Sequence, residues 1–262
     1  MRLETQKIYD LVCRLNQKKG QWSFLTSIEY MLQSNIYMDG VFHDANIVTQ
    51  YIKSHSKILD FGTGSGIFAV MLAQIKNQGK IFGLDAWQNK SQKDSNFNDT
   101  ATEQTRLWKE LGKTLPIIFQ HYNGLHIPFS DNTFDIITAY AVIEHIDPAD
   151  VNQILKELKR VLKKDGTLFI FKTPRKLAYT EHLLNLVGMP QHEILFQDSE
   201  IRTILQKNKF EILKHWHSNF VPEFPGKMTN HLYPFLKYLD YFFSHSPFQL
   251  FSHHNNFILK KI

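Results

Sequence analysis

Short apolar runs alternate with amphipathic stretches through the middle of the chain. Five runs rich in Ile, Leu and Phe are short and bounded by polar residues or glycine, which is typical of buried parallel strands. They cover residues 57–61, 81–85, 116–120, 134–139 and 167–171. Apolar residues recur at helical spacing between them, over residues 67–75, 101–111 and 151–162. Strands that alternate with helices predict a parallel sheet covered on both faces.

The flanks of this region carry other patterns. Apolar residues from position 8 to 15 repeat at helical spacing before Gly20, and a second helical stretch covers 47–52. We therefore predict an N-terminal helical cap over 1–50 and the main domain over 51–262. Beyond the fifth strand the pattern predicts one helix and two more strands, at residues 199–205, 210–213 and 256–260.

A glycine-rich turn joins the first strand to the following helix. Gly62, Gly64 and Gly66 let a ligand approach the backbone closely, and the helix start presents free N–H groups. Asp85 ends the next strand, where a carboxylate can accept hydrogen bonds from both hydroxyls of a ribose. Nicotinamide enzymes place their third glycine one residue later, where this chain has Ile67. The pattern indicates a nucleoside ligand; the alternative is a tight turn packed for structural reasons.

Three further segments extend this pattern. Residues 123–129 read Asn-Gly-Leu-His-Ile-Pro-Phe, residues 142–146 read Val-Ile-Glu-His-Ile, and residues 158–171 join a helix to the fifth strand. In this order and spacing, residues 57–174 resemble the class I S-adenosylmethionine-dependent methyltransferases, of a small-molecule type similar to methyltransferase types 11 and 23. The resemblance implies an α/β fold with a Rossmann-like, doubly wound, seven-stranded and mostly parallel sheet. It also implies helices on both faces, an N-terminal helical cap and a C-terminal helical insertion.

The resemblance implies S-adenosylmethionine as the cofactor and assigns the glycine turn to it. Gly62, Gly64 and Gly66 would form the turn beside the methionine end of the cofactor. Asp60 would order nearby amines, directly or through water, and Asp85 would hold the ribose hydroxyls.

A second group of residues is assigned to the adenine and to the methionine amino group. Ala86 or Trp87 would cover one face of the adenine. Asn123 stands where the family usually has Asp, and its carbonyl can still accept from the adenine amine. The backbone of three residues would supply the remaining contacts: Gly124 to the adenine ring, and Ala139 and Tyr140 to the amino group.

Two residues after the fourth strand are the candidate catalytic groups. Methyl transfer is a one-step displacement, so the enzyme mainly aligns the acceptor atom and excludes water. A general base helps where the acceptor is a hydroxyl or an amine. Glu144 and His145 lie at the expected carboxyl edge of the sheet, where ligands bind. The alternative is a helix-start acid beside a packed histidine.

The remaining histidines point less clearly to a function. In this family the acceptor pocket is usually built after the fifth strand, here from segments 175–198 and 220–252. His182 and His192 lie in the first segment, and each is interpreted as structural or solvent-facing. The pair His253-His254 has no partner pattern that resembles a zinc site, so we assign no metal.

These residues predict a S-adenosylmethionine-dependent methyltransferase that acts on a small molecule, lipid-like or glycan in character. Two alternatives stay open. A non-catalytic regulatory protein could bind the cofactor through the same glycine turn, and a nicotinamide-dependent oxidoreductase is the other, disfavoured by Ile67. The sequence does not determine whether the acceptor atom is oxygen, nitrogen or carbon.

Residues 220–252 are unusually rich in Phe, Tyr and Leu. Such a segment can pack on the core, against a second subunit in a homodimer, or on a membrane surface. Its main charges are Lys237 and Asp240, so the polar face is not strongly basic. We expect burial within the protein or in a dimer interface, with the segment forming one wall of the acceptor pocket. Peripheral membrane contact is the competing hypothesis.

Composition adds the cellular context. The 262 residues are 43% hydrophobic and 21% charged, which suits one globular domain with a core. The net charge of +5 is spread over short blocks such as 156–164, so we expect no nucleic-acid partner.

Cys13 is the only cysteine, which excludes an internal disulfide and fits a reducing compartment. Residues 1–20 lack the apolar run of a signal peptide, and no stretch is apolar enough to span a bilayer, so we expect a cytoplasmic protein. The polar run 88–100 is expected to be an inserted loop.

Overall fold

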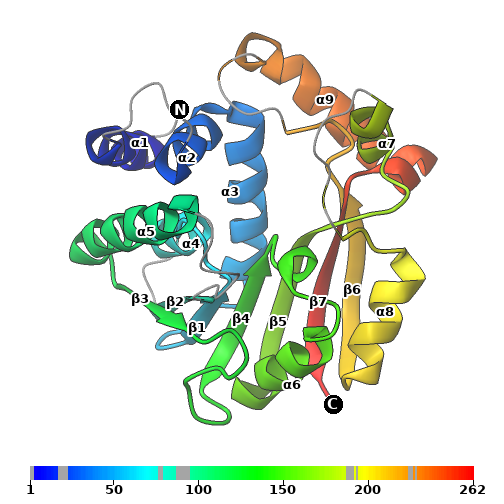
Figure 1. Cartoon of the computed structure of the whole chain (residues 1–262). Coiled ribbons are helices and arrows are strands. Elements are labelled where there is room, and N and C mark those ends of the chain that lie inside the picture. The colour runs from blue at the N-terminus through cyan, green and yellow to red at the C-terminus, as the bar shows by residue number, and fades with distance from the viewer. Residues whose placement is uncertain are drawn as a thin grey trace.

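The computed structural model describes residues 3–16, 23–75, 79–86, 95–186, 192, 194–223, 227 and 229–262, and a seven-stranded sheet forms its centre (Figure 1). The strands lie in the order β3-β2-β1-β4-β5-β7-β6. Pairing is parallel from β3 through β5, and β7 runs antiparallel to both β5 and β6. Their bounds are β1 Lys57–Phe61, β2 Lys80–Ala86, β3 Ile117–Tyr122, β4 Phe134–Tyr140, β5 Leu162–Pro174, β6 Phe210–Ser218 and β7 His254–Lys261. The predicted doubly wound, mostly parallel sheet is confirmed.

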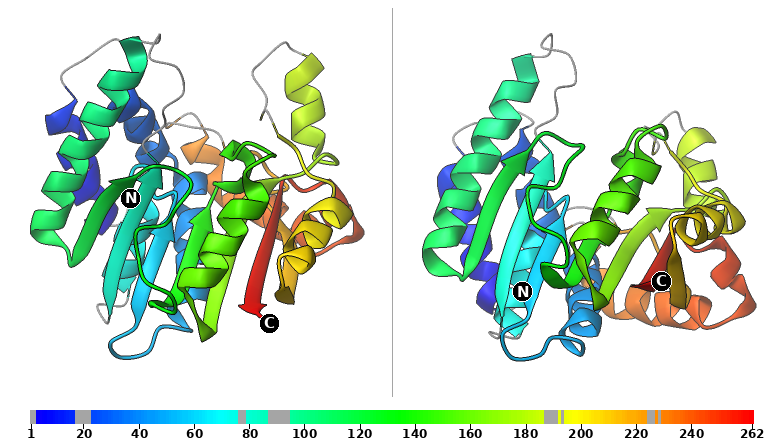
Figure 2. Two further views of the ribbon diagram at one scale, coloured as in Figure 1. Left: turned by 60° about the horizontal axis from the view of Figure 1, so that its bottom comes forward. Right: turned by 90° about the horizontal axis from the view of Figure 1, so that it is seen from below.

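Helices cover both faces of the sheet (Figure 2), and successive residues of a strand point to opposite faces. In β1, Ile58 packs in a core shared with the N-terminal helices, whereas its neighbour Leu59 packs in the core on the opposite face. The first layer comprises α1 Leu3–Leu15, α2 Phe24–Gln33, α3 Asn35–Thr49, α4 Ile67–Ile75 and α5 Ser95–Thr114. The second comprises α6 Val151–Val161 and α8 Asp198–Lys207. The order of strand connection reverses between β1 and β4, and ligands bind at the carboxyl ends of the strands at such a point.

Several boundaries differ from the prediction. Residues 95–100, expected to belong to the inserted loop, form the first turns of α5, while residues 88–94 lie outside the described residues. Asn, Asp and Thr are weak helix formers, but tertiary context overrides such a preference. The helix expected to run through Leu162 ends at Val161, because Leu162 pairs with Phe134 and begins β5. The pattern also missed α7, which spans Tyr179–Leu186.

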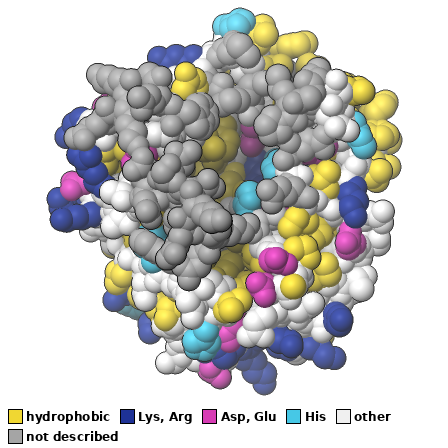
Figure 3. All heavy atoms as spheres, in the orientation of Figure 1, with side chains coloured by type: hydrophobic (Ala, Val, Ile, Leu, Met, Phe, Trp, Pro, Cys, Tyr) yellow, Lys and Arg dark blue, Asp and Glu magenta, His cyan; other side chains and the backbone are white. Residues whose placement is uncertain are grey.

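The predicted helical insertion lies between β6 and β7 and contains η2 Asn230–Leu232, α9 Tyr233–Ser244 and η3 Pro247–Phe251. The large hydrophobic side chains that are more than 45% exposed in α9 and η3 are Phe235, Tyr238, Tyr241, Phe242, Phe248, Leu250 and Phe251. We call them the aromatic face; hydrophobic side chains gather over α9 at the upper right of Figure 3. Burial of these residues within the chain, predicted above, is therefore wrong. One helix edge packs inward, and Asp240 accepts from the Val221 N–H at 2.8 Å, but the apolar residues surround the helix.

The helices of the described residues include none that is both long and apolar enough to cross a bilayer.

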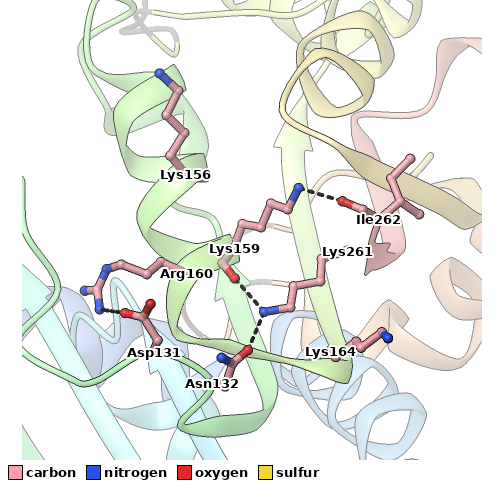
Figure 4. A pocket seen from close by; sticks show the side chains of 8 residues that line it. All are labelled: Asp131, Asn132, Lys156, Lys159, Arg160, Lys164, Lys261 and Ile262. Atoms are coloured by element: carbon pink, nitrogen blue, oxygen red, sulfur yellow. Dashed lines mark hydrogen bonds and ion pairs between the residues drawn. The ribbon is translucent and has the colours of Figure 1, made fainter.

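A basic hollow of about 440 Å³ lies at the amino edge of the parallel strands, away from the glycine turn (Figure 4). Lys159 Nζ donates to the carbonyl of Ile262 at 2.6 Å, and Arg160 pairs with Asp131 at 2.9 Å. Lys261 Nζ donates to Asn132 Oδ1 at 2.7 Å. These cations already contact oxygens of the chain, as expected for a solvated helix end.

Candidate active site

The glycine turn between β1 and α4 has a left-handed backbone. The φ angles are +66° at Gly62, +51° at Gly64 and +81° at Gly66, a region that favours glycine. A Cβ at Gly62 would lie 2.5 Å from a methyl group of Val142, and one at Gly66 would lie 2.8 Å from the Phe119 ring. Among the described residues, a Cβ at Gly64 would have only the Gly62 carbonyl within 4 Å, at 3.9 Å. The turn is thus packed at its outer glycines and open at the middle one.

Asp60 supports the turn from the end of β1. The residue is 1% exposed, and its carboxylate accepts from Thr63 Oγ1 at 2.6 Å and from Thr138 Oγ1 at 2.8 Å. Burial raises the pKa of Asp60 to about 6, although these hydrogen bonds oppose the shift. The three side chains link the ends of β1 and β4 below the turn.

The peptide groups of Gly64 are held by residues from β2 and α5. Asp85 Oδ2 accepts from the Gly64 N–H at 2.7 Å and from Gln104 Nε2 at 3.1 Å. The Gly64 carbonyl accepts from Gln104 Nε2 at 2.9 Å and from Trp108 Nε1 at 3.0 Å. Burial raises the pKa of Asp85. Asp85 therefore orders the turn directly.

The residues predicted to contact adenine lie next to one another beside this turn. A Cβ at Gly124, where φ is +88°, would lie 3.7 Å from the Cβ of Ala86. Asn123 is exposed, and its Oδ1 accepts from the backbone N–H groups of Leu125 and His126 at 3.2 and 3.1 Å. The Asn123 carbonyl thus caps its own turn. Trp87 lies outside the described residues.

A cavity of about 1030 Å³ extends from the glycine turn along the carboxyl edge of the sheet. Asp60, Gly62 and Gly64 line one end, and its surface is mainly apolar. The ring of Tyr140, also in the wall, stacks on Phe68 with centroids 4.6 Å apart. The predicted acceptor segments contribute Thr180, Leu183, Leu186, His192, Pro222 and Glu223. The N-terminal helices contribute Met31, Tyr37 and Val41, which the sequence did not assign to the site.

A buried ion pair forms part of the cavity wall. Lys172 Nζ donates to Glu223 Oε1 at 2.6 Å and also to Asn219 Oδ1. Lys172 has a φ of +62°, and its side chain is 4% exposed. Such a pair fixes the relative position of the two segments more than it stabilises the folded state, because desolvation of the two charges offsets much of their attraction. The pair ties the end of β5 to the segment after β6.

Residues 59–170 match the family model described as "Methyltransferase domain". This segment is thus similar to methyltransferase domains. The chain is also 32% identical over 123 residues to a demethylmenaquinone methyltransferase of Lactobacillus johnsonii, a match that covers 47% of this chain and 46% of that protein. The chain spans about half the length of the curated relatives it matches.

Solved structures agree on the fold. A SAM dependent methyltransferase from Aquifex aeolicus matches with a TM-score of 0.56 at 16% identity, over 92% of this chain and 100% of that one. The [4+2]-cyclase SpnF matches with a TM-score of 0.55 at 15% identity, over 97% of this chain and 94% of that one. At such identities the likeness establishes the methyltransferase-type fold alone.

The candidate catalytic residues of the methyltransferase domain lie in η1, which spans Ile143–His145 after β4. Glu144 is 3% exposed, and its Oε2 has no hydrogen-bond partner among the described residues. Burial raises the pKa of Glu144 to about 8. His145 is exposed. Neither is among the described residues that line the 1030 Å³ cavity, so the structure does not bring them to its wall.

Three other ionisable side chains come together at the far end of the cavity. Glu181 Oε1 lies 2.9 Å from His192 Nδ1 and 2.7 Å from His253 Nε2. Burial raises the pKa of Glu181, but its contacts with His253 and His192 outweigh burial and lower it to about 2. Nothing in the sequence indicated that His192 and His253 lie next to each other. Glu181 carried no signal, because α7 itself was not predicted.

Gln104 and Trp108 were also missed. They stand four residues apart and so share one face of α5, and both contact Gly64. The available signal was their helical spacing within residues 101–111. This spacing does not identify which loop that face of the helix contacts.

Proposed function

We propose that this chain transfers the methyl group of S-adenosylmethionine to an apolar or part-apolar small molecule. The observation that carries the proposal is one continuous, mainly apolar cavity that begins at the open Gly64 of the glycine turn. Such a space can hold a cofactor at the turn and an acceptor beside it. The name of the Lactobacillus johnsonii relative supports an acceptor related to demethylmenaquinone.

The residues around the turn fit the proposed cofactor. The open space at Gly64 is a cradle that a side chain would fill, and Gly62, Gly64 and Gly66 shape it. We propose that Asp60 orders the amino group, together with the backbone of Ala139 and Tyr140. Asp85 would hold the ribose, while Ala86, Asn123 and Gly124 would contact the adenine.

S-adenosylmethionine, when bound, supplies a methyl group activated by a positively charged sulfur. The chain then has to align the acceptor and exclude water. Met31, Tyr37 and Val41 line the cavity from the N-terminal helices and would serve the second purpose. The catalytic role of Glu144 and His145 stays a proposal: a carboxyl group with a pKa near neutrality suits proton transfer, but it would have to reach the acceptor from η1.

Calorimetry with S-adenosylhomocysteine and NAD tests the cofactor, and transfer from labelled S-adenosylmethionine to demethylmenaquinone-type acceptors tests the reaction. We expect binding of S-adenosylhomocysteine and no comparable binding of NAD. Tighter NAD binding would refute the cofactor assignment. Cofactor binding without transfer to any apolar acceptor tried would favour the non-catalytic regulatory alternative.

The aromatic face supports a finer proposal. We propose that α9 rests on a membrane surface, from which a lipid-like acceptor enters the cavity of a cytoplasmic enzyme. The exposed Phe and Tyr side chains of α9 would otherwise stand in water, and patches of this kind mark interaction sites. A homodimer that covers the same face is the alternative, and it predicts concentration-dependent association in place of liposome binding.

A further inference from the structure

Glu181, His192 and His253 come from three separate segments and converge on one point. Glu181 belongs to α7, and His253 immediately precedes β7. One ligand atom of each residue lies within 4.8 Å of the other two. Two imidazole nitrogens and one carboxylate oxygen form the donor set found in several catalytic zinc sites, where an open position remains for water or substrate.

Within the described residues, two polar atoms of the cluster make no hydrogen bond. Glu181 is 1% exposed, and its Oε2 has no hydrogen-bond partner in the part of the chain that the structure describes. His253 Nε2 lies close to Glu181 Oε1 but outside hydrogen-bond geometry. An unmade hydrogen bond at a buried charged group is costly, so such a group needs a further partner. A cation between these atoms would satisfy both.

The surroundings hold His253 in a metal-binding orientation. Its other ring nitrogen, Nδ1, lies 3.0 Å from Thr180 Oγ1, and the ring of His254 stacks on it with centroids 4.3 Å apart. Histidines that bind metals use their second nitrogen in this way, which fixes the ring and its tautomer. With the proton on Nδ1, Nε2 presents its lone pair to the cluster.

We propose that Glu181, His192 and His253 bind a divalent transition-metal ion of the zinc type. Imidazole nitrogens favour such ions over Mg²⁺ and Ca²⁺, which prefer oxygen ligands. Two of the three ligands, His192 and His253, line the cavity, so the open coordination positions would face this end of it. Insofar as the proposed methyl transfer holds, the ion would bind and orient an oxygen of the acceptor at this end of the cavity.

Metal binding is tested directly on the full chain after treatment with EDTA. Calorimetric titration with ZnCl₂ should give one site per chain, and Zn²⁺ should raise the melting temperature, because the ion binds the folded state. Titration with CoCl₂ should give visible absorption bands of an N/O-ligated ion. Glu181→Gln and His253→Ala should each weaken Zn²⁺ binding at least about tenfold.

His182→Ala is the matched control, because His182 is exposed on the same helix and is no part of the cluster. It should leave the affinity for Zn²⁺ unchanged. Circular dichroism and affinity for S-adenosylhomocysteine, measured without metal, report whether each variant folds. The absence of a saturable site, or a site that survives in both cluster variants, would overturn the proposal. The proposed function fails separately, if the metal-free protein does not bind S-adenosylhomocysteine.

Discussion

The indole N–H of Trp108 donates a hydrogen bond to the carbonyl of Gly64, with 3.0 Å between nitrogen and oxygen. Gln104, one turn earlier in α5, donates to the same carbonyl and to Asp85. The helix that follows β2 thus holds a turn that follows β1. The shape of the open glycine position depends on side chains that lie far from it in the sequence.

Trp108→Phe should weaken binding of S-adenosylhomocysteine. The phenyl ring preserves packing against Phe119, on which Trp108 stacks at 5.2 Å, but removes the hydrogen bond to Gly64. Losing one hydrogen bond of about 1 kcal/mol corresponds to roughly fivefold in the dissociation constant. Calorimetry measures the dissociation constant, and Tyr238→Phe on the exposed face of α9 is the control. Equal affinities would mean that the turn keeps its shape without the indole.

Alanine at Gly62 and at Gly64 should have different effects. Both positions have positive φ, which costs an L-residue roughly 1–2 kcal/mol. Only at Gly62 does the new methyl also clash with Val142, so Gly62→Ala should lower the melting temperature more. Gly64→Ala places its methyl in the open space and should mainly abolish cofactor binding. Thermal melts and calorimetry on both variants check this, and the reverse order would contradict the assignment of the cradle.

Asp85→Ala should weaken binding of S-adenosylhomocysteine by roughly 1.5–3 kcal/mol, or about ten- to a hundredfold. The substitution removes the ribose acceptor and the partner of the Gly64 N–H together. Asp85→Asn separates the two roles, because an amide oxygen can still accept from Gly64. We expect an intermediate affinity for Asp85→Asn. An unchanged dissociation constant in Asp85→Ala would leave Asp85 with no role in the site.

Glu144→Gln should stabilise the protein, and more so at higher pH. Burial raises the pKa of Glu144 from 4.5 to about 8, so between these values the unfolded chain has released a proton that the folded chain keeps. The free energy of unfolding therefore falls as pH rises through this window. Gln mimics the protonated form, and the gain should be about 1–3 kcal/mol at pH 8 and small near pH 4.5. Urea unfolding at both pH values measures it.

The same variant tests the proposed catalytic role. Turnover that falls in Glu144→Gln and His145→Ala, with cofactor affinity retained, would support that role. Full turnover in both would assign the two residues to the structure of η1.

Tyr238→Ser with Phe242→Ser should abolish binding to liposomes. Both side chains are more than half exposed, so their loss should leave the melting temperature within a few degrees of the parent. Flotation with vesicles that contain anionic lipid measures binding, and sedimentation velocity reports association. Persistent flotation of the double variant would rule out this face as the membrane contact. A dimer that dissociates in the variant would instead favour the subunit interface.

The sequence by itself determined the sheet and the position of the cofactor turn. Both depend on local patterns: strands buried on two faces are short apolar runs, and a turn with positive φ at Gly62 and Gly64 requires glycine. The order of the segments then predicts that Asp60 and Asp85 end neighbouring strands, because consecutive strands usually lie side by side. Since the two strands are parallel, their carboxyl ends meet at one edge of the sheet. For these reasons the fold and the position of the glycine turn within it could be predicted.

Only the tertiary structure decided the acceptor side. Lys172 meets Glu223, and Glu181 meets His192 and His253, across segments whose relative placement no local period encodes. The apolar sequence of α9 likewise does not determine how many of its side chains the core covers. The helix packs on α3 and can bury only one edge there. Contacts between distant segments arise from packing, and the sequence limits those contacts without selecting among them.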